Sequence, residues 1–457
     1  MSLRVAPARA AGVRVPRVRP AVVLAAAGLV ALLAGALVAG GGAPEADPSG
    51  LGSAGALVEW GLPLVTLAGR VAAVGTVGTL LLAAVLLPGR SGLPAESRRA
   101  LRAASSWALG WAAAAALGAL LTVSRLLGVS PTALTWAPLR VFLEDTGAGR
   151  AAMLVVALTG LVGVAARRCT GVRAALALLL VAGAALVVPV ALSGHSAAAE
   201  DHLLAVTTLG VHVVAATVWI GGLLVLLVHA RHGAAARVAA PRFSRLALVC
   251  FLAVAASGVL GAGLLLGGAA GALAALGTGY GALLLAKTAG LTVLGVIGAL
   301  HRRHTLPRLG AGDAREFRRF AVGEVVLMLA TVALAVALAA SPPPAGAGHA
   351  AASATAPAAG ADPMAGHDHG ELSVGVLVDD DRFHVAGPVA PGARVTVFNS
   401  SAAEVTLTAA DGSFDVVVPS GTLTTFLAPA DPGPHLFTSR RSPAHADVLV
   451  VQSSSVR

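Results

Sequence analysis

Residues 203–228 read LLAVTTLGVHVVAATVWIGGLLVLLV, a run of 26 residues without a single charged side chain. A helix of about 20 apolar residues crosses the roughly 30 Å hydrocarbon core of a bilayer. This run is therefore predicted to span a membrane. Eight further stretches share its character, and we expect nine spans, at 20–41, 62–87, 103–124, 151–166, 174–193, 203–228, 246–267, 279–300 and 320–340.

The composition agrees with a polytopic membrane protein. Hydrophobic residues make up 56% of the 457 residues and charged residues 12%, whereas soluble domains carry about 25% charge. This composition excludes a soluble enzyme, a disordered chain and a nucleic-acid-binding protein. The net charge of +10 does not indicate nucleic-acid binding, because basic residues in a membrane protein first report its topology. Two widely separated cysteines, Cys169 and Cys250, exclude a disulfide scaffold, a zinc finger and an iron–sulfur site.

The arginines predict the orientation of the spans. If residues 1–19 are cytoplasmic, the five inside segments carry 22 Arg, and the short outside loops carry two, Arg140 and Arg150. An excess of this kind marks cytoplasmic loops, and an odd number of spans then places the C-terminus outside. The first span could instead be a signal peptide. Its apolar run is too long for a typical one, so we expect it to remain uncleaved.

Four regions follow along the chain. A basic N-terminal tail (1–19) precedes a transmembrane helical domain (20–340), and a linker rich in Pro, Ala, Gly and His covers 341–370. From 371 to 457, eight short β-branched runs such as ARVTVFN and ADVLVVQ alternate with turn dipeptides. This texture predicts a small all-β sandwich outside the membrane. The fold class is thus mostly α, a polytopic bundle with a C-terminal β domain.

Histidines gather around the start of the sixth span. His195 and His202 bracket an outer loop that also holds Glu200 and Asp201, and His212 lies ten residues into the span, close to the midplane. Ionisable groups inside a membrane are costly and mark functional sites, and imidazole suits copper, zinc, iron and nickel. The three histidines are therefore predicted metal ligands. The alternative to a metal site is that His195 and His202 are ordinary loop residues and that His212 forms a hydrogen bond to a neighbouring helix.

Other intramembrane groups are weaker candidates. Arg70 and Lys287, the one lysine of the chain, could pair with a carboxylate, a carbonyl or a haem propionate, or extend to an interface. Met153 and Met328 could supply thioether ligands, although filling gaps in the core is the more common use of methionine.

The linker offers a second metal site. The sequence DPMAGHDHG places Met364, His367 and His369 within six residues. One thioether and two imidazoles can bind a copper ion in either oxidation state, Cu(I) or Cu(II). The alternative is a low-complexity linker with incidental histidines.

The stretch SGHSAAAEDHLLAVTTLGVHVVAATVWIGGL resembles the signature of the copper resistance protein D (CopD) family. RFSRLALVCFLAVAASGVLGA (242–262) and YGALLLAKTAGLTVLGVIGALHRR (280–303) are similar to the spans that follow in that family, and the likeness covers about residues 60–344. The resemblance implies copper handling at the inner membrane, with a β-sandwich partner. It singles out His195, His202, His212, Trp219 and Lys287 without assigning their roles.

The C-terminal domain resembles a cupredoxin that has lost its copper site. Ser439 stands at the expected Cys position and Thr406 near the first His position, while His445 remains. A blue-copper site needs a thiolate, and this domain has no cysteine. We expect a degenerate cupredoxin-like or chaperone-like module that docks or positions a copper donor.

These observations predict copper transport or handling across the cytoplasmic membrane by a multi-pass protein that serves copper homeostasis or resistance. A haem-binding electron-transfer protein and a non-transporting scaffold for oxidase assembly or copper sensing are the alternatives. The sequence has no nucleophile–base pair and no phosphate-binding loop, so we expect no enzymatic activity. The expected partners are the lipid bilayer and an extracytoplasmic copper-donor protein, with no nucleic acid.

Overall fold

Nine helices long and apolar enough to cross a membrane occur in the part of the chain that the computed structural model describes. That part comprises residues 20–44, 54–89, 92–192, 199–230, 233–266, 268–300, 302–303, 315–341, 374–378, 382–385, 389, 391–399, 401, 403–419, 423–440 and 446–452. The spanning helices are α1 (Pro20–Gly40), α2 (Ala56–Leu81), α3 (Ala95–Leu127), α5 (Gly147–Ala165), α6 (Val172–Leu192), α7 (Ala199–His229), α8 (Gly233–Leu266), α10 (Gly279–Leu300) and α12 (Arg315–Ala340). The prediction of a polytopic helical protein is confirmed.

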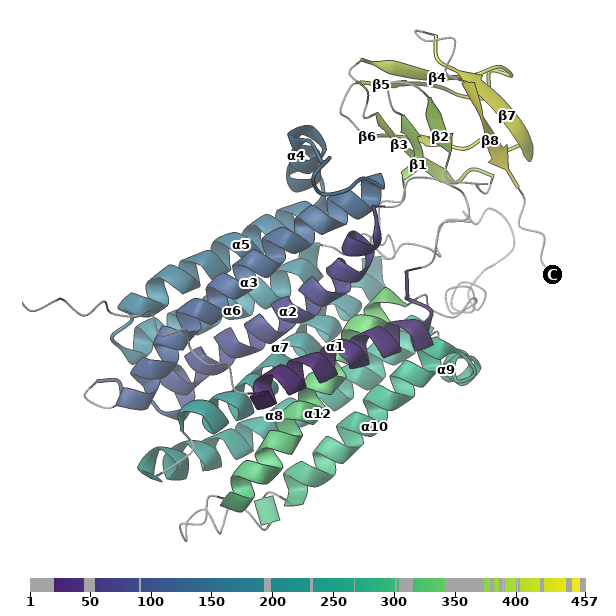
Figure 1. The fold of residues 1–457 in the computed structure, drawn as a ribbon. Coiled ribbons are helices and arrows are strands. Elements are labelled where there is room, and N and C mark those ends of the chain that lie inside the picture. Colours follow the sequence, from purple (N-terminus) through teal and green to yellow (C-terminus); the bar gives the residue numbers. More distant parts are fainter. Residues whose placement is uncertain are drawn as a thin grey trace, which may run out of the picture.

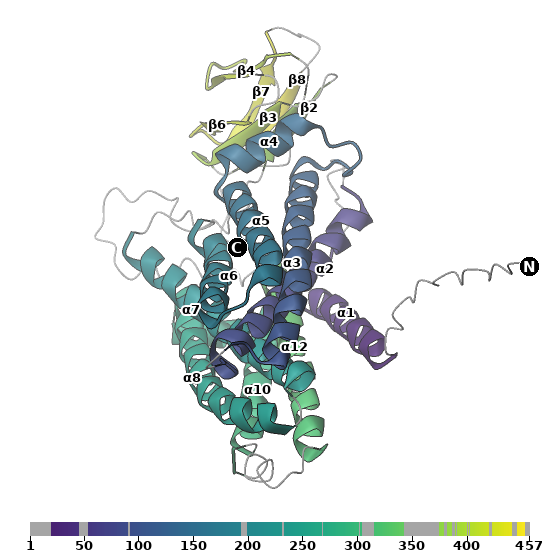
Figure 2. The same ribbon diagram turned by 90° about the vertical axis from the view of Figure 1, so that its left-hand side faces the viewer.

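Helix α2 lies at the centre of the bundle, which Figures 1 and 2 show from two sides. One group of buried residues joins α2 to α3, α5 and α6, and a second joins α2 to α7, α8, α10 and α12. Of all the spans, α2 is the most deeply buried. Helix α1 packs at the periphery against α12 and α10. The membrane domain is therefore two helix groups that share one inner helix.

The two groups meet where α2 crosses α7. A Cβ added to Gly78 would overlap the backbone carbonyl of Gly221, and one added to Gly221 would lie 2.6 Å from the carbonyl oxygen of Val74. Small residues allow this approach, because in a lipid environment close backbone packing replaces the hydrophobic drive to associate. The next residue of α7, Gly222, lies against the ring of Phe243 from α8.

Several helices extend beyond the spans predicted from hydropathy. Helix α3 begins at Ala95 rather than 103, and α8 begins at Gly233 rather than 246. The additional N-terminal turns of these two helices carry arginines. Arginines lower the mean hydropathy of a sequence window, but a helix end that lies in water tolerates them. Helix α2 ends in a π-helical turn (Leu82–Leu86), whose last carbonyl accepts a hydrogen bond of 3.1 Å from Arg242 of α8. The short helices α4 (Trp136–Asp145) and α9 (Ala269–Ala275) were not predicted.

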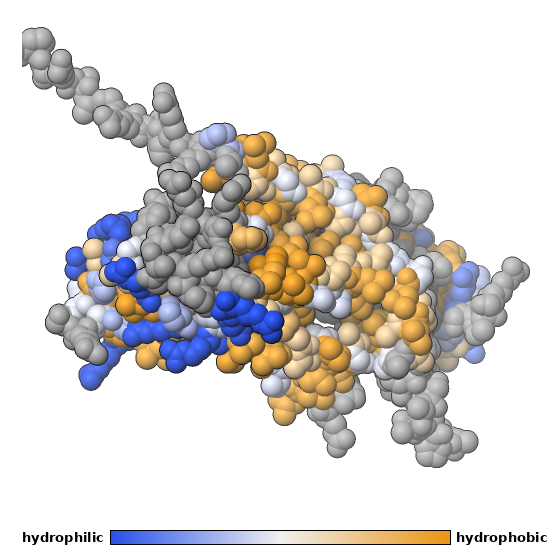
Figure 3. Space-filling model, turned by 90° about the horizontal axis from the view of Figure 1, so that it is seen from below, coloured by the Kyte–Doolittle hydropathy of each residue, from blue (hydrophilic) through white to orange (hydrophobic). Residues whose placement is uncertain are grey.

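The lateral surface of the bundle is apolar. Seen from below in Figure 3, the flank is covered by hydrophobic residues, and hydrophilic ones gather toward the ends. Exposed large side chains such as Leu180, Leu203 and Val259, each more than 65% accessible, occur in three different spans. In water such a surface would aggregate, whereas lipid tails solvate it. The protein is therefore a multi-pass membrane protein.

Two four-stranded sheets form the C-terminal domain. One has the order β2-β1-β3-β6 and the other β5-β4-β7-β8. The strands are β1 (Val374–Val378), β2 (Phe383–Val385), β3 (Arg394–Asn399), β4 (Val405–Ala409), β5 (Asp415–Val418), β6 (Leu423–Leu427), β7 (Gly433–Thr438) and β8 (Ala446–Val451). All pairings are antiparallel except β1 with β3. Each strand overlaps one of the eight predicted runs, and β7 begins two residues before its run.

The core of this domain is aromatic. The rings of Phe383 and Phe437 lie 5.0 Å apart between centroids, and those of Phe414 and Phe426 lie 4.8 Å apart. Valine and leucine from both sheets complete the same buried cluster. The sheets stand beyond one end of the bundle, beside α4 (Figures 1 and 2).

Candidate metal site in the membrane

His212 is held by a hydrogen bond between two neighbouring spans. Its Nδ1 lies 3.0 Å from the hydroxyl oxygen of Ser257 on α8. That hydroxyl donates its single proton to the carbonyl of Ala253 at 2.6 Å, so it must accept the bond from Nδ1–H. This assignment leaves the lone pair on Nε2. A histidine whose Nδ1–H is held by an acceptor is the usual arrangement for a metal ligand that binds through Nε2.

The surroundings of the ring come from α7, α8 and α10. Gly258 follows Ser257, and the place of its missing side chain is 3.7 Å from ring carbon Cε1 of His212. Lys287 of α10 lies within electrostatic range of the imidazole. Seven residues along α7, the buried Trp219 meets Phe251 of α8 edge to face, with 5.7 Å between the ring centroids. The histidine therefore lies in a mostly apolar helix interface with one cation nearby.

Most other predicted ligands cannot be placed. His195, Met364, His367 and His369 lie outside the described residues, and His202 belongs to the first turn of α7 without a described side chain. Glu200 and Asp201 share that turn. Within the described residues, no three His, Cys, Asp or Glu side chains gather closely enough to hold a metal ion. His212 is thus a single anchored imidazole, and the predicted three-histidine set stays a prediction.

The candidate methionines and intramembrane cations differ in how deeply they are buried. Met328 of α12 is almost completely buried in the cluster that contains Trp219, so it fills the core. Met153 of α5 is 40% exposed. Arg70 is exposed on α2, and Lys287 is half-buried.

Comparison with protein families now bears on these helices. Residues 57–204 match the family model of the copper resistance protein D-like N-terminal domain, and residues 237–338 match that of copper resistance protein D. The two ranges follow each other in the order of one protein and together cover more than half of the chain. The helical domain belongs to the copper resistance protein D family.

Membership in the copper resistance protein D family associates the helical domain with copper resistance. His195 and His202 fall in the first matched range and Lys287 in the second, whereas His212 and Trp219 lie between the two. Comparison with curated proteins and with solved structures finds no significant match. The cupredoxin-like character of the C-terminal domain therefore stays a prediction.

Sequence reasoning missed Glu324, a buried acid in the ninth span. Its side chain is 5% exposed, one turn inside the start of the apolar part of α12. The signal was available, because an acidic residue within an apolar span marks a functional position by default. Ser257 was quoted in a motif but not singled out. Its partnership with His212, 45 residues away, depends on how α7 and α8 pack.

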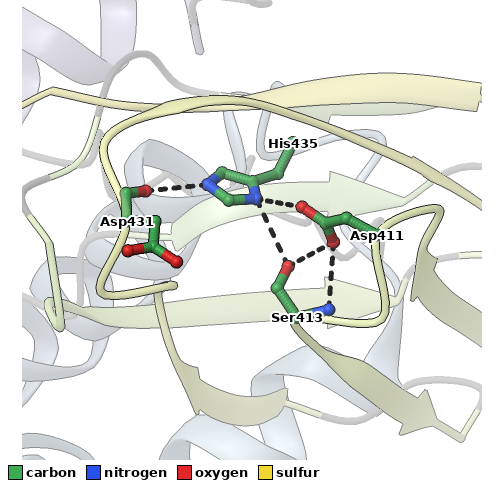
Figure 4. Close-up of polar contacts among 4 residues, drawn as sticks. All are labelled: Asp411, Ser413, Asp431 and His435. Atoms are coloured by element: carbon green, nitrogen blue, oxygen red, sulfur yellow. Dashed lines mark hydrogen bonds and ion pairs between the residues drawn. The ribbon is translucent and has the colours of Figure 1, made fainter.

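The C-terminal domain contains a second anchored histidine, which the sequence did not reveal. His435 of β7 is buried, and its Nδ1 lies 2.5 Å from Oδ2 of Asp411 while its Nε2 lies 2.9 Å from the carbonyl of Asp431 (Figure 4). Asp411 also accepts bonds from the hydroxyl and amide of Ser413. Because Asp411 and Ser413 face the same ring nitrogen, the three residues do not form a proton relay for nucleophilic attack.

The charge state of this network follows from its partners. The Asp431 carbonyl and then the Asp411 carboxylate raise the pKa of His435 above its usual value. Hydrogen bonds from Ser413, followed by that from His435, lower the pKa of Asp411 to about 2. With both ring nitrogens bonded, His435 has no lone pair to offer a metal. The network joins the β4–β5 turn to β7, which is a structural role.

The predicted loss of a blue-copper centre can be compared with the described positions. Thr406 uses its hydroxyl to accept a bond of 2.8 Å from the amide of Arg440, and Ser439 is buried beside it. Neither offers a thiolate or an imidazole. His445 lies outside the described residues.

Proposed function

We propose that the protein carries copper ions across the cytoplasmic membrane and thereby contributes to copper homeostasis or resistance. The observation that carries the proposal is His212, an imidazole deep in a span whose Nδ1 is bonded to Ser257 and whose Nε2 is left as a ligand. The family adds copper as the ion concerned.

The route begins outside the membrane. Copper is collected by Met364, His367 and His369, passes to His195 and His202, and reaches His212 within the bundle. Acidic Glu200 and Asp201 attract cations at the mouth. In each transfer the copper ion leaves one thioether or imidazole ligand and binds the next. The ion is therefore never left without a protein ligand in the hydrocarbon region. Copper is the cargo here, and the C-terminal domain positions its donor.

This route requires the N-terminus inside and the C-terminal domain outside. The Arg asymmetry supports it. A fluorescent reporter that is active only in the cytoplasm, fused after Arg457, is expected to stay dark, and a reporter active only outside is expected to give signal. The reverse result contradicts the orientation.

Copper flux tests the function directly. The full-length protein is reconstituted into liposomes that contain a copper-sensitive dye, and signal is compared with that of protein-free liposomes. We expect protein-dependent flux. Copper binding without flux contradicts transport and favours the scaffold. A pyridine haemochrome spectrum with stoichiometric haem favours the electron-transfer alternative, for which the described spans offer no second histidine on a helix facing His212.

A further inference from the structure

A groove of about 370 Å³ lies near one end of the bundle, and Trp219, its lining residue nearest to His212 along α7, is seven residues from that histidine. Its back wall comes from α7 and α12, with Trp219 and Glu324, and its sides come from α8 and α10. Arg302 and Arg303, which follow α10 in the chain, also line the groove. A cavity of this size, mostly apolar with a few convergent polar groups, is the usual form of a binding site for a small amphiphile.

Helix packing explains why the groove opens sideways. Helix α8 packs along α7, and α10 packs along α12, whereas α8 and α10 have no extensive backbone contact. They approach each other through the Phe251 ring, which reaches Gly295. The rim carries Leu248, which is 40% exposed, and the exposed Ala299. The opening therefore faces the flank of the bundle, where lipid surrounds the protein.

The charges stand at the end of the groove that lies at the membrane boundary. Arg302 and Arg303 are two and three residues beyond Leu300, the last residue of the eighth span, with Arg302 half-buried and Arg303 exposed. Glu324 lies within electrostatic range of Arg302. Arg302 and Arg303 each carry a positive charge. Guanidinium groups bind phosphate oxygens through paired N–H donors in a fixed geometry, so two adjacent arginines suit a phosphate group.

We propose that this groove binds one anionic phospholipid of the surrounding bilayer. The phosphate lies on Arg302 and Arg303, and one acyl chain lies along the apolar walls of α8 and α10. A water-borne anion would not use those walls, and a zwitterionic lipid would gain less from the arginines, because its own cation offsets the phosphate charge. Basic pockets between spanning helices commonly hold anionic headgroups in this way. The proposal does not depend on copper transport.

Lipid retention by the full-length protein tests the charged end. After purification in mild detergent, native mass spectrometry is recorded while phosphatidylglycerol or phosphatidylcholine is added back. We expect one phosphatidylglycerol to be retained in preference to phosphatidylcholine. The double variant R302Q/R303Q is expected to lose roughly 30-fold in affinity for phosphatidylglycerol. The control R102Q removes an exposed Arg from the start of α3 and is expected to change nothing. Equal retention by the double variant overturns the proposal.

Filling the groove tests the apolar part. Gly298 lines it, and a Cβ added there meets nothing within 4 Å, so Gly298→Leu introduces a side chain at the groove with an unobstructed Cβ. We expect the variant to melt at the wild-type temperature and to retain no lipid. Gly160→Leu, an equally open glycine of α5, is the control. Unchanged retention by Gly298→Leu, or full displacement of the lipid by soluble glycerol phosphate, contradicts a site that holds an acyl chain.

Discussion

Two histidines of this protein are both anchored, and they differ in how many ring nitrogens are occupied. His212, in the membrane, has Nδ1 bonded to Ser257, an assignment that leaves the lone pair of the imidazole on Nε2. His435, in the β domain, has Nδ1 bonded to Asp411 and Nε2 bonded to the Asp431 carbonyl. The first is oriented and still able to bind, whereas the second is fully used. A count of histidines cannot separate the two roles, but their hydrogen bonds can.

The partners differ in charge as well as in number. Ser257 is a neutral acceptor, which fixes the tautomer of His212 without adding charge to the bilayer interior. Asp411 is a carboxylate exposed to solvent, which favours the protonated form of His435. A protonated imidazole repels a metal cation, so the β-domain histidine is doubly unsuited to copper.

The largest effect on copper flux is expected from a substitution of His212, the histidine with an available ring nitrogen. His212→Ala removes the proposed ligand at mid-depth, where the bilayer offers no substitute, and copper flux into liposomes should fall at least about tenfold. His435→Ala should leave the flux unchanged. His229→Ala, at the end of the same helix, is a second control. Wild-type flux with His212→Ala removes His212 from the route.

A smaller effect is expected from Ser257→Ala. The ligand remains, but its tautomer and orientation are no longer fixed, and partners of this kind are typically worth 10–100-fold in metal affinity. The copper concentration for half-maximal flux should rise roughly tenfold, with less change in the maximal rate. Thr217→Ala removes a hydroxyl bonded only within α7 and serves as the control. Identical curves for the two variants contradict an orienting role for Ser257.

Third in size is the effect of replacing Met364, His367 and His369 together by Ala. Ordering a flexible ligand set costs entropy, so the wild-type linker should bind copper weakly and release it readily. The triple variant of the full chain should show a few-fold lower flux at limiting copper and normal flux at saturating copper. Wild-type binding at the linker should weaken below about pH 6.5, where imidazole is protonated. Equal flux at limiting copper means that the linker only connects domains.

The smallest effect concerns pH and the His435 network. The pKa of Asp411 falls from 3.8 to about 2 on folding, so its contribution to stability is present above pH 4 and lost as the pH falls toward 2. The pKa of His435 is raised above 6.5, so its contribution is present below 6.5 and lost at higher pH. After correction for the intrinsic pH dependence of amide exchange, the protection of the β4–β5 turn in the full chain should be greatest between about pH 4 and 6.5.

A variant isolates that prediction. His435→Gln should raise exchange in the turn roughly fivefold to tenfold, the equivalent of about one net hydrogen bond, and should flatten the pH profile of the protection on its alkaline side. An unchanged profile shows that the imidazolium does not stabilise the turn. Copper flux is expected to stay constant throughout.

Hydropathy alone was enough to predict the nine spans, because each bilayer crossing demands its own apolar run. Alternation was likewise enough for the eight strands, since each has one face in the Phe437 core. Helix α4 was not predicted, because its ten residues mix apolar and charged side chains and show neither a spanning apolar run nor strand alternation. The depth of His212 could be counted from the sequence, but its bond to Ser257 depends on the crossing of α7 and α8. The same holds for the groove, whose walls come from four helices that no local pattern relates.

The crossing of α2 and α7 restricts how the two helix groups can move. At Gly78 and Gly221 backbone meets backbone, with no side chains between them to rearrange. Sliding α7 along α2 would push Gly221 into the side chains that flank Gly78, whereas rotation about the contact moves no atom through another. The crossing is therefore a pivot, and His212, nine residues before it on α7, is at the end of a lever about 14 Å long. A tilt of a few degrees there displaces the imidazole by about an ångström, enough to make or break a metal–nitrogen bond.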